Sequence, residues 1–188
     1  RGGFESEAGR MSRLVDDLLL VALLDAGPAI APGPVGLNAL LADAVSDARA
    51  AGPDHAWSLA LPPEEVIAWG DHHRLHQVVA NLLANARTHT PGGTRVQAGL
   101  HVADGYAVIT VRDDGPGIAP ELAEHVFERF TRGETSRARR SGAPSTGLGL
   151  AIVAAVMDAH GGTASVASVP GDTRFTLAVP LASRPVPL

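Results

Sequence analysis

The sequence predicts an α+β fold: a two-layer sandwich in which helices cover one face of a mixed sheet, with a helical arm at the N-terminus. Two observations predict it. Segments with helical spacing of apolar residues and segments with alternating apolar residues follow one another without the strict alternation of a βαβ protein. In addition, 188 residues are enough for one compact domain with a sizeable core plus an arm.

Composition excludes several function classes. The net charge of −5 provides no general attraction for nucleic acid or anionic lipid. The chain has no cysteine, and all 15 basic residues are arginine, so neither a Walker P-loop lysine nor Schiff-base chemistry is available. The longest apolar run, 18–24, is too short to cross a bilayer. We expect a cytoplasmic chain, and leave open whether a longer parent protein is anchored in the cell membrane.

The elements begin with the arm, residues 1–26, where apolar residues from Met11 to Ala22 recur at an average spacing of 3.5, as in a bundle helix. The Gly- and Pro-containing stretch "AGPAIAPGP" then predicts a linker at 27–35. We expect the main domain to cover 36–182, followed by a short tail at 183–188.

Within the domain, the most regular helical pattern is that of Leu75, Val78, Val79, Leu82, Leu83 and Ala86, which share one face. A turn signal, Asp104-Gly105, joins two alternating segments into a hairpin. The predicted elements are a helix at 37–48, strands at 55–62 and 64–71, a helix at 71–90, hairpin strands at 94–102 and 106–113, a short helix near 120–130, a helix from 147 to about 160, and a final strand pair.

Two amides stand out on the helix at 71–90. Asn81 and Asn85 are spaced i, i+4, so they lie one above the other at the edge of the apolar stripe. Each amide could simply bond a neighbouring loop. Alternatively, the two oxygens could face a hard cation such as Mg²⁺, which prefers oxygen ligands.

A carboxylate ends the apolar face of the second hairpin strand. Asp113 shares the face of Ala107, Ile109 and Val111, and a buried carboxylate requires a donor. The donor could be a turn amide, because Asp is common before Gly. It could also be the amino group of a purine.

An arginine-rich segment, "ERFTRGETSRARR" at 128–140, precedes "TGLGLAI", which opens a helix. Such a segment is usually a solvated loop, although its position also suits a lid over a polyphosphate. A helix N-terminus preceded by glycines favours phosphate binding. The dinucleotide fingerprint is absent, since the third glycine is missing.

The order "HQVVANLLANARTHTP", "DDGPGIA", "FERFTRG", "TGLGLAIV" resembles the N, G1, F and G2 boxes of the sensor histidine kinase catalytic domain, a member of the Bergerat-fold ATPases. The resemblance covers about 36–182. The arm, in turn, resembles the second helix of the kinase dimerisation hairpin. The implied function is transfer of the γ-phosphate of ATP to a histidine, with relay to a response regulator.

The resemblance also implies roles for individual residues. Asn85, with Asn81, would hold Mg²⁺ against the nucleotide phosphates, and Asp113 would accept from the adenine amino group. Arg129 and Arg132 would contact the γ-phosphate as catalytic residues. The remaining ATP-binding residues that it implies are His89, Gly115, Gly117, Ile118, Thr146, Gly147, Leu148, Gly149 and Leu150.

The sequence departs from the family pattern at Thr88, where a lysine is common, at His89, where tyrosine is common, and in "SGAPST" before the G2 box. None of the eight histidines has the context of a phosphoacceptor, so the acceptor hairpin should lie outside this chain, on the same parent protein, a homodimer, or on a partner. A degenerate nucleotide-binding or docking module without transferase activity remains the alternative. A hydrolytic ATPase of the gyrase type is disfavoured because 72–90 contain no acidic residue.

Overall fold

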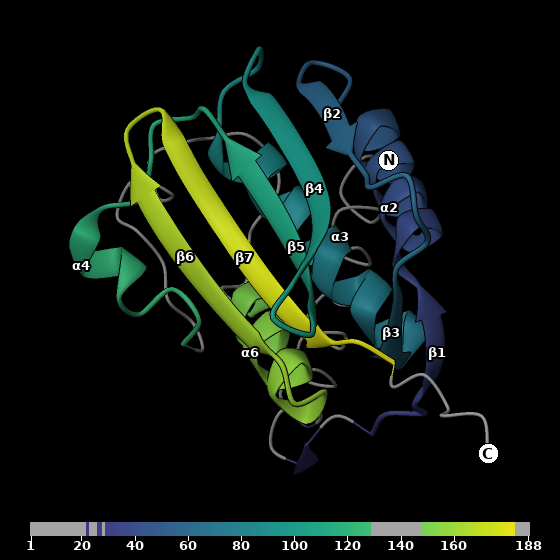
Figure 1. Ribbon diagram of the computed structural model, residues 1–188. Helices are drawn as coiled ribbons and strands as arrows, with labels where there is room; N and C mark the ends of the chain where they lie inside the picture. The colour runs from purple at the N-terminus through teal and green to yellow at the C-terminus, as the bar shows by residue number, and fades with distance from the viewer. Residues whose placement is uncertain (1–21, 23–25, 28, 129–147, 183–188) are drawn as a thin grey trace, which may run out of the picture.

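The structure of the chain, a computed structural model, describes residues 22, 26–27, 29–128 and 148–182 (Figure 1). The predicted arm, apart from a few of its residues, and the predicted tail lie outside this part of the chain. Within it, no helix is long and apolar enough to span a membrane.

The centre of the fold is a five-stranded mixed sheet, visible face-on in Figure 1. At one edge of the sheet, β2 (Ala56–Ala60) and β4 (Arg95–Ala103) are parallel, and every other neighbouring pair is antiparallel. In spatial order the strands are β2, β4, β5 (Tyr106–Asp113), β7 (Asp172–Pro180) and β6 (Thr163–Val169).

Three helices cover one face of this sheet: α2 (Leu37–Ala51), α3 (His72–His89) and α6 (Gly149–Ala159). The opposite face, turned to the viewer in Figure 1, carries none of them. This arrangement confirms the predicted two-layer α+β sandwich. The short helix expected near 120–130 is α4 (Pro120–Ala123), which is followed by turns, and it lies beside β6.

A second, two-stranded sheet pairs β1 (Gly33–Gly36) with β3 (Ile67–Gly70) in antiparallel register. The predicted linker, 27–35, therefore ends in a strand. Its glycines and prolines are typical of a loop, but Val35 is only 3% exposed and belongs to the core. The pairing of β1 with β3 and the burial of this side chain together attach the start of the domain to the rest of the fold.

The core forms between the helices and the inner face of the sheet. In α3 the predicted stripe is buried as a whole, and the side chain of Asp71 caps the helix by accepting from Arg74 N at 3.1 Å. The sheet contributes alternate residues of its long strands, which are Val96, Ala98, Leu100, Ala107, Ile109, Val111, Phe175, Leu177 and Val179.

Replacing Leu82, which is fully buried in this core, with alanine should lower the free energy of unfolding by about 2–5 kcal/mol, because it leaves a cavity against the sheet. Urea denaturation followed by circular dichroism measures the loss. The matched control is Leu61→Ala, since Leu61 is 36% exposed, and it should cost about 0.5 kcal/mol or less. Equal losses in the two variants would contradict the packing described here.

Candidate functional site

The two asparagines of α3 lie half-buried at the margin of the core, as predicted. Asn81 Nδ2 donates to Gly149 O at 3.2 Å, so this amide joins α3 to the first residue of α6. The side chain of Asn85, one turn later, forms no hydrogen bond with any residue that the structure describes. The start of α6 therefore accepts a hydrogen bond from the amide nitrogen of Asn81. The amide oxygens of Asn81 and Asn85 accept no hydrogen bond from the described residues.

Asp113 is the last residue of β5 and is 6% exposed. Its Oδ1 accepts from Gly115 N at 3.0 Å, which is the turn amide that the sequence offered as one partner. Burial raises the pKa of the Asp113 carboxyl above its ordinary value. Oδ2 accepts no hydrogen bond from the described residues, and among them no buried polar atom is left without a partner. This oxygen is therefore accessible to a donor from a ligand.

The turn after Asp113 contains two glycines that the structure requires. A Cβ on Gly115 would lie 2.6 Å from Thr90 Cγ2 and 2.8 Å from Asp113 Oδ1. Gly117 has a φ of +84°, and a Cβ there would lie 3.0 Å from the backbone at 169–170. At both of these predicted site residues, neighbouring protein atoms leave no room for a Cβ. The structure therefore explains the two glycines by packing within the protein and not by contact with a ligand.

This turn is fixed to the β6–β7 hairpin by two hydrogen bonds. Gly115 O accepts from Gly171 N at 2.8 Å, and Ile118 N donates to Ser168 Oγ at 2.8 Å. The side chain of Ile118 is half-buried and packs on the core. Hydrogen bonds with the β6–β7 hairpin therefore hold the turn that follows Asp113 in place.

The start of α6 completes the site. Leu148 is 1% exposed and Leu150 packs against the core, so their side chains serve the fold and only their backbone could face a ligand. A Cβ on Gly149 would meet no atom of the described residues within 4 Å, so the space over this residue is open as far as they reach. The remaining predicted residues of this region, Arg129, Arg132, Thr146 and Gly147, lie outside the described residues.

One flank of α3 brings these parts together. Asn81 contacts the start of α6, and Thr90, which follows the last helical turn, lies against Gly115. Nine residues of α-helix separate these two contacts by about 13 Å. The described site is therefore elongated, with the carboxylate of Asp113 at one end and the asparagines and Gly149 toward the other. His89 is exposed in the last turn of α3.

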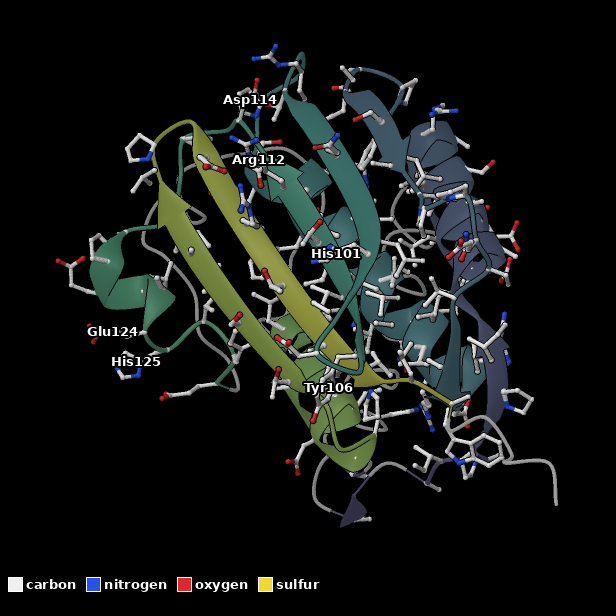
Figure 2. All side chains as sticks on the ribbon, viewed as in Figure 1. His101, Tyr106, Arg112, Asp114, Glu124 and His125 are labelled. Atoms are coloured by element: carbon white, nitrogen blue, oxygen red, sulfur yellow. The ribbon has the colours of Figure 1, made fainter. Side chains whose placement is uncertain are left out.

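Neighbouring charges are paired, in contrast to Asp113. Asp114 Oδ2 contacts Arg95 Nε at 2.7 Å, and this ion pair lowers the pKa of Asp114. Arg112 Nε contacts Asp172 Oδ1, also at 2.7 Å. Figure 2 shows Arg112 and Asp114 together at the end of β5 where the site turn begins. Asp113 thus remains the acidic group at this end whose pKa is raised by burial.

Sequence reasoning missed Thr90 and His55. Thr90 Oγ1 donates to Ala86 O at 2.6 Å, and His55 Nε2 lies 2.9 Å from the same hydroxyl. A hydroxyl residue at the end of a helix, directly before proline, is a signal that could have suggested a cap for Thr90. Nothing in the sequence links it to His55, which is 35 residues away.

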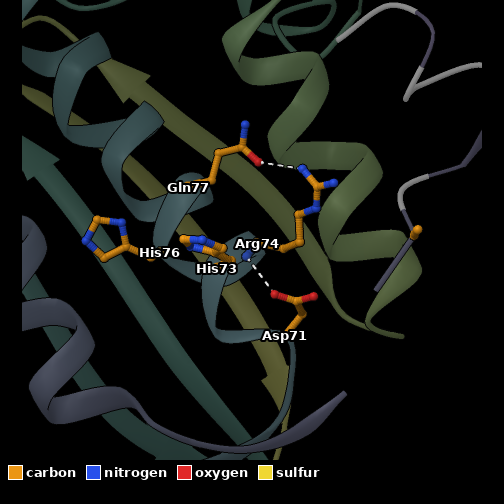
Figure 3. A pocket seen from close by; sticks show the side chains of 6 residues that line it. Asp71, His73, Arg74, His76 and Gln77 are labelled. Carbon is orange, nitrogen blue, oxygen red and sulfur yellow. Dashed lines mark hydrogen bonds between the residues drawn. The ribbon is translucent and has the colours of Figure 1, made fainter. Parts of the chain in front are cut away.

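A hollow of about 470 Å³ lies at the other end of α3 and is shown in Figure 3. It brings together none of the predicted site residues; its lining is Ala29, Asp71, His73, Arg74, His76 and Gln77. Arg74 Nη1 donates to Gln77 Oε1 at 3.2 Å, and Asp71 Oδ2 accepts from Ala31 N. Among the described residues, no three His, Cys, Asp or Glu side chains group together to hold a metal.

Comparison with known proteins places this geometry in a family. Residues 70–183 match the family model described as "Histidine kinase-, DNA gyrase B-, and HSP90-like ATPase". The chain belongs to this ATPase family. The resemblance inferred from the four boxes is confirmed, and α3, the turn after Asp113 and α6 all lie within the matched range.

Relatives of this ATPase chain include the probable sensor histidine kinase TcrY of Mycobacterium tuberculosis, 57% identical over 94% of the chain. The sensor histidine kinase TrcS of the same organism is 44% identical over 94%. The chain spans 37% and 35% of the lengths of these two relatives. Their full activities therefore belong to longer proteins.

Solved structures give the same fold. The mycobacterial sensor histidine kinase MprB is 31% identical with a TM-score of 0.69, covering 82% of this ATPase chain and all of that one. The ATP binding domain of PrrB from Mycobacterium tuberculosis is 33% identical with a TM-score of 0.65, covering 81% of this chain and 98% of that domain.

The raised pKa of Asp113 predicts that this carboxylate destabilises the unliganded ATPase domain. The penalty is complete above the raised folded pKa and disappears as the pH falls below the ordinary value of 3.8. Asp113→Asn should therefore unfold at a higher temperature than the parent chain at pH 7, and the gain should shrink as the pH approaches 3. Differential scanning calorimetry across this range measures it.

The adjacent Asp114→Asn is the matched control with the opposite sign. Because Arg95 lowers the pKa of Asp114, ionisation of this carboxylate stabilises the fold above pH 3.8, and that stabilisation is lost as the pH falls. Asp114→Asn should unfold at a slightly lower temperature at pH 7, since the pair is partly exposed. Shifts of the same sign in both variants would contradict the assignment.

Proposed function

We propose that this chain is the ATP-binding catalytic module of a sensor histidine kinase, which transfers the γ-phosphoryl group of ATP to a histidine on a dimerisation hairpin. The observation that carries the proposal is the buried Asp113, whose free oxygen lies at one end of the α3 flank while uncommitted amide oxygens lie toward the other. The identity of 57% to a probable sensor histidine kinase supports the reaction type.

The base of the nucleotide would bind at the Asp113 end. A carboxylate that accepts one hydrogen bond from the described residues can accept a second from the adenine amino group. Gly115, Gly117 and Ile118 shape the turn beneath it, and burial strengthens the contact because little water competes there. His89, exposed in the last turn of α3, would border the bound nucleotide.

Asn85 and Asn81 would hold Mg²⁺ with their amide oxygens. The donor set fits this ion, because both are neutral oxygen ligands on one face of α3 and Mg²⁺ is usually held by few protein ligands together with substrate phosphates. When bound, Mg²⁺ neutralises charge on the phosphates. The bond from Asn81 Nδ2 to Gly149 O fixes the orientation of its amide oxygen.

The phosphates would bind at the N-terminus of α6, with Thr146, Gly147, Leu148, Gly149 and Leu150 contributing backbone groups. The open space above Gly149 supports this placement. Arg129 and Arg132 remain the proposed contacts of the γ-phosphate. In the reaction the bond from the γ-phosphorus to the bridging oxygen breaks, a bond to an imidazole nitrogen forms, and ADP leaves.

The accepting histidine is proposed to lie on a hairpin outside this chain, in a homodimeric parent protein or on a separate partner, with a response regulator as the next acceptor. The burial of His55 and His160, each 8% exposed and hydrogen-bonded, supports this, because neither can present its ring to another domain. We expect the module to act in the cytoplasm, where ATP is available.

Incubation with γ-labelled ATP and Mg²⁺, together with a separately supplied acceptor hairpin, should label the hairpin and leave this chain unlabelled. The label should survive alkali and be lost in acid, as a phosphohistidine is. Asp113→Asn should abolish it, although the variant remains folded. Nucleotide binding without any label on a competent hairpin would favour the degenerate docking module, to which the uncharged Thr88 points.

Asn85→Ala should weaken ADP binding at least tenfold when Mg²⁺ is present, about the effect of losing one hydrogen bond to a charged group. It should change binding little when the metal is chelated, because the variant removes an oxygen ligand. Isothermal titration calorimetry under both conditions measures the difference. Gln77→Ala is the matched control, since it removes an amide two turns earlier on the same helix whose oxygen already accepts from Arg74. An equal loss with and without Mg²⁺ would argue against a metal role for Asn85.

A further inference from the structure

A buried titratable side chain next to the proposed adenine site has no role in the function above. His55 lies immediately before β2, and its side chain is 3% exposed. Its ring is 5.8 Å from that of Trp57. Its Nδ1 lies 3.1 Å from Asp54 Oδ1, and its Nε2 lies 2.9 Å from Thr90 Oγ1. Both ring nitrogens are therefore engaged.

The direction of these hydrogen bonds follows from the acceptors. Ala86 O can only accept, so the hydroxyl of Thr90, 2.6 Å away, donates to it. Thr90 Oγ1 must then accept from His55 Nε2–H. The carboxylate of Asp54 can likewise only accept, so His55 Nδ1 donates to it, which lowers the pKa of Asp54. The imidazole thus connects a surface carboxylate to the end of α3.

Thr90 carries this connection to the proposed base site. Its Cγ2 occupies the space directly beside Gly115, where a Cβ would be 2.6 Å away, and Asp113 Oδ1 borders the same space at 2.8 Å. Gly115 N is the only donor to Asp113 Oδ1 within the part of the chain that the structure describes. A displacement of Thr90 would therefore move the turn amide that orients the Asp113 carboxylate.

We propose that His55 is a positioning residue for adenine recognition, which acts through the Thr90 hydroxyl to hold the wall of the site beside Gly115 and Asp113. The proposal rests on the proposed nucleotide function. It makes His55 and Thr90 determinants of the preference for adenine over a base that lacks the exocyclic amino group.

The charged groups around His55 are consistent with this role. Asp54 accepts a hydrogen bond from His55 directly, and the positive charge of Arg87 on α3 also lowers the pKa of Asp54. Interaction with His55 lowers the pKa of Asp113, although burial has the larger effect and raises it. His55 therefore lies electrostatically within reach of the carboxylate whose direction it would control.

The experiment compares binding of ADP with that of IDP, which carries a carbonyl in place of the adenine amino group, by titration calorimetry with Mg²⁺. His55→Asn keeps a donor near Nδ1 but cannot reach Thr90, whereas His55→Gln keeps a donor near Nε2. His55→Asn should weaken ADP binding about fivefold, the usual effect of one hydrogen bond, and leave IDP nearly unchanged. His55→Gln should retain the ADP preference within about twofold, since its hydrogen bond to Thr90 remains.

Thr90 supplies a second pair of variants that keeps the test decisive if His55→Asn does not fold. Thr90→Val keeps the methyl group of threonine and replaces the hydroxyl with a second methyl, and it should reduce the ADP preference about fivefold, again the effect of one hydrogen bond. Thr90→Ser keeps the hydroxyl but removes Cγ2, the atom that lies beside Gly115, so it should also reduce the preference. His160→Gln is the control for stability alone, because His160 has the same exposure of 8% but binds Asp71 N at the opposite end of α3.

The outcomes separate this inference from the proposed function. If Asp113→Asn leaves the ADP preference intact, the adenine site itself is wrong. If Asp113→Asn removes the preference but His55→Asn and Thr90→Val retain it, only the positioning role is overturned. A lower unfolding temperature with an unchanged ratio of ADP to IDP affinity would likewise overturn it, since a merely structural role has that result.

Discussion

The packing of α3 against the inner face of the sheet is the interaction on which the rest of the structure depends. Its stripe from Leu75 to Ala86 is buried against alternate residues of β4, β5 and β7. Because this stripe is narrow, the helix positions beside it fall at the margin of the core. Asn81 and Asn85 occupy that margin, so the packing that stabilises the domain also orients the side chains proposed for the metal.

A carboxylate at the same site forms no ion pair with any residue that the structure describes. Asp114 is balanced by Arg95, and Asp172 by Arg112. Asp113 accepts only from Gly115 N among the described residues, while burial raises its pKa. A free acceptor in an apolar setting lowers the stability of the empty domain, yet it strengthens the bond with an incoming donor, since water competes poorly there. Stability and recognition oppose each other at this residue.

Local patterns could be predicted from the sequence, whereas contacts between distant segments could not. The stripe of α3 and the face of Asp113 follow from periodicity. The Asp104-Gly105 turn has φ values of 50° and 81°, as the residue pair indicates. The pairing of β1 with β3 and of β2 with β4 joins segments far apart in the chain and depends on the whole sheet. The bond between His55 and Thr90 has the same origin, so no spacing in the sequence reveals it.

Two buried histidines hold α3 at its opposite ends. His160 Nε2 accepts from Asp71 N, and its Nδ1 donates to Val156 O, which fixes the start of α3 to α6. His55 donates to Thr90 at the other end. Each residue of a helix advances by about 100°, so a shift of α3 by a single position would turn Asn85 away from the site. Fixing the helix at both ends opposes such a shift, and the geometry of the asparagines therefore depends on hydrogen bonds that lie outside the site itself.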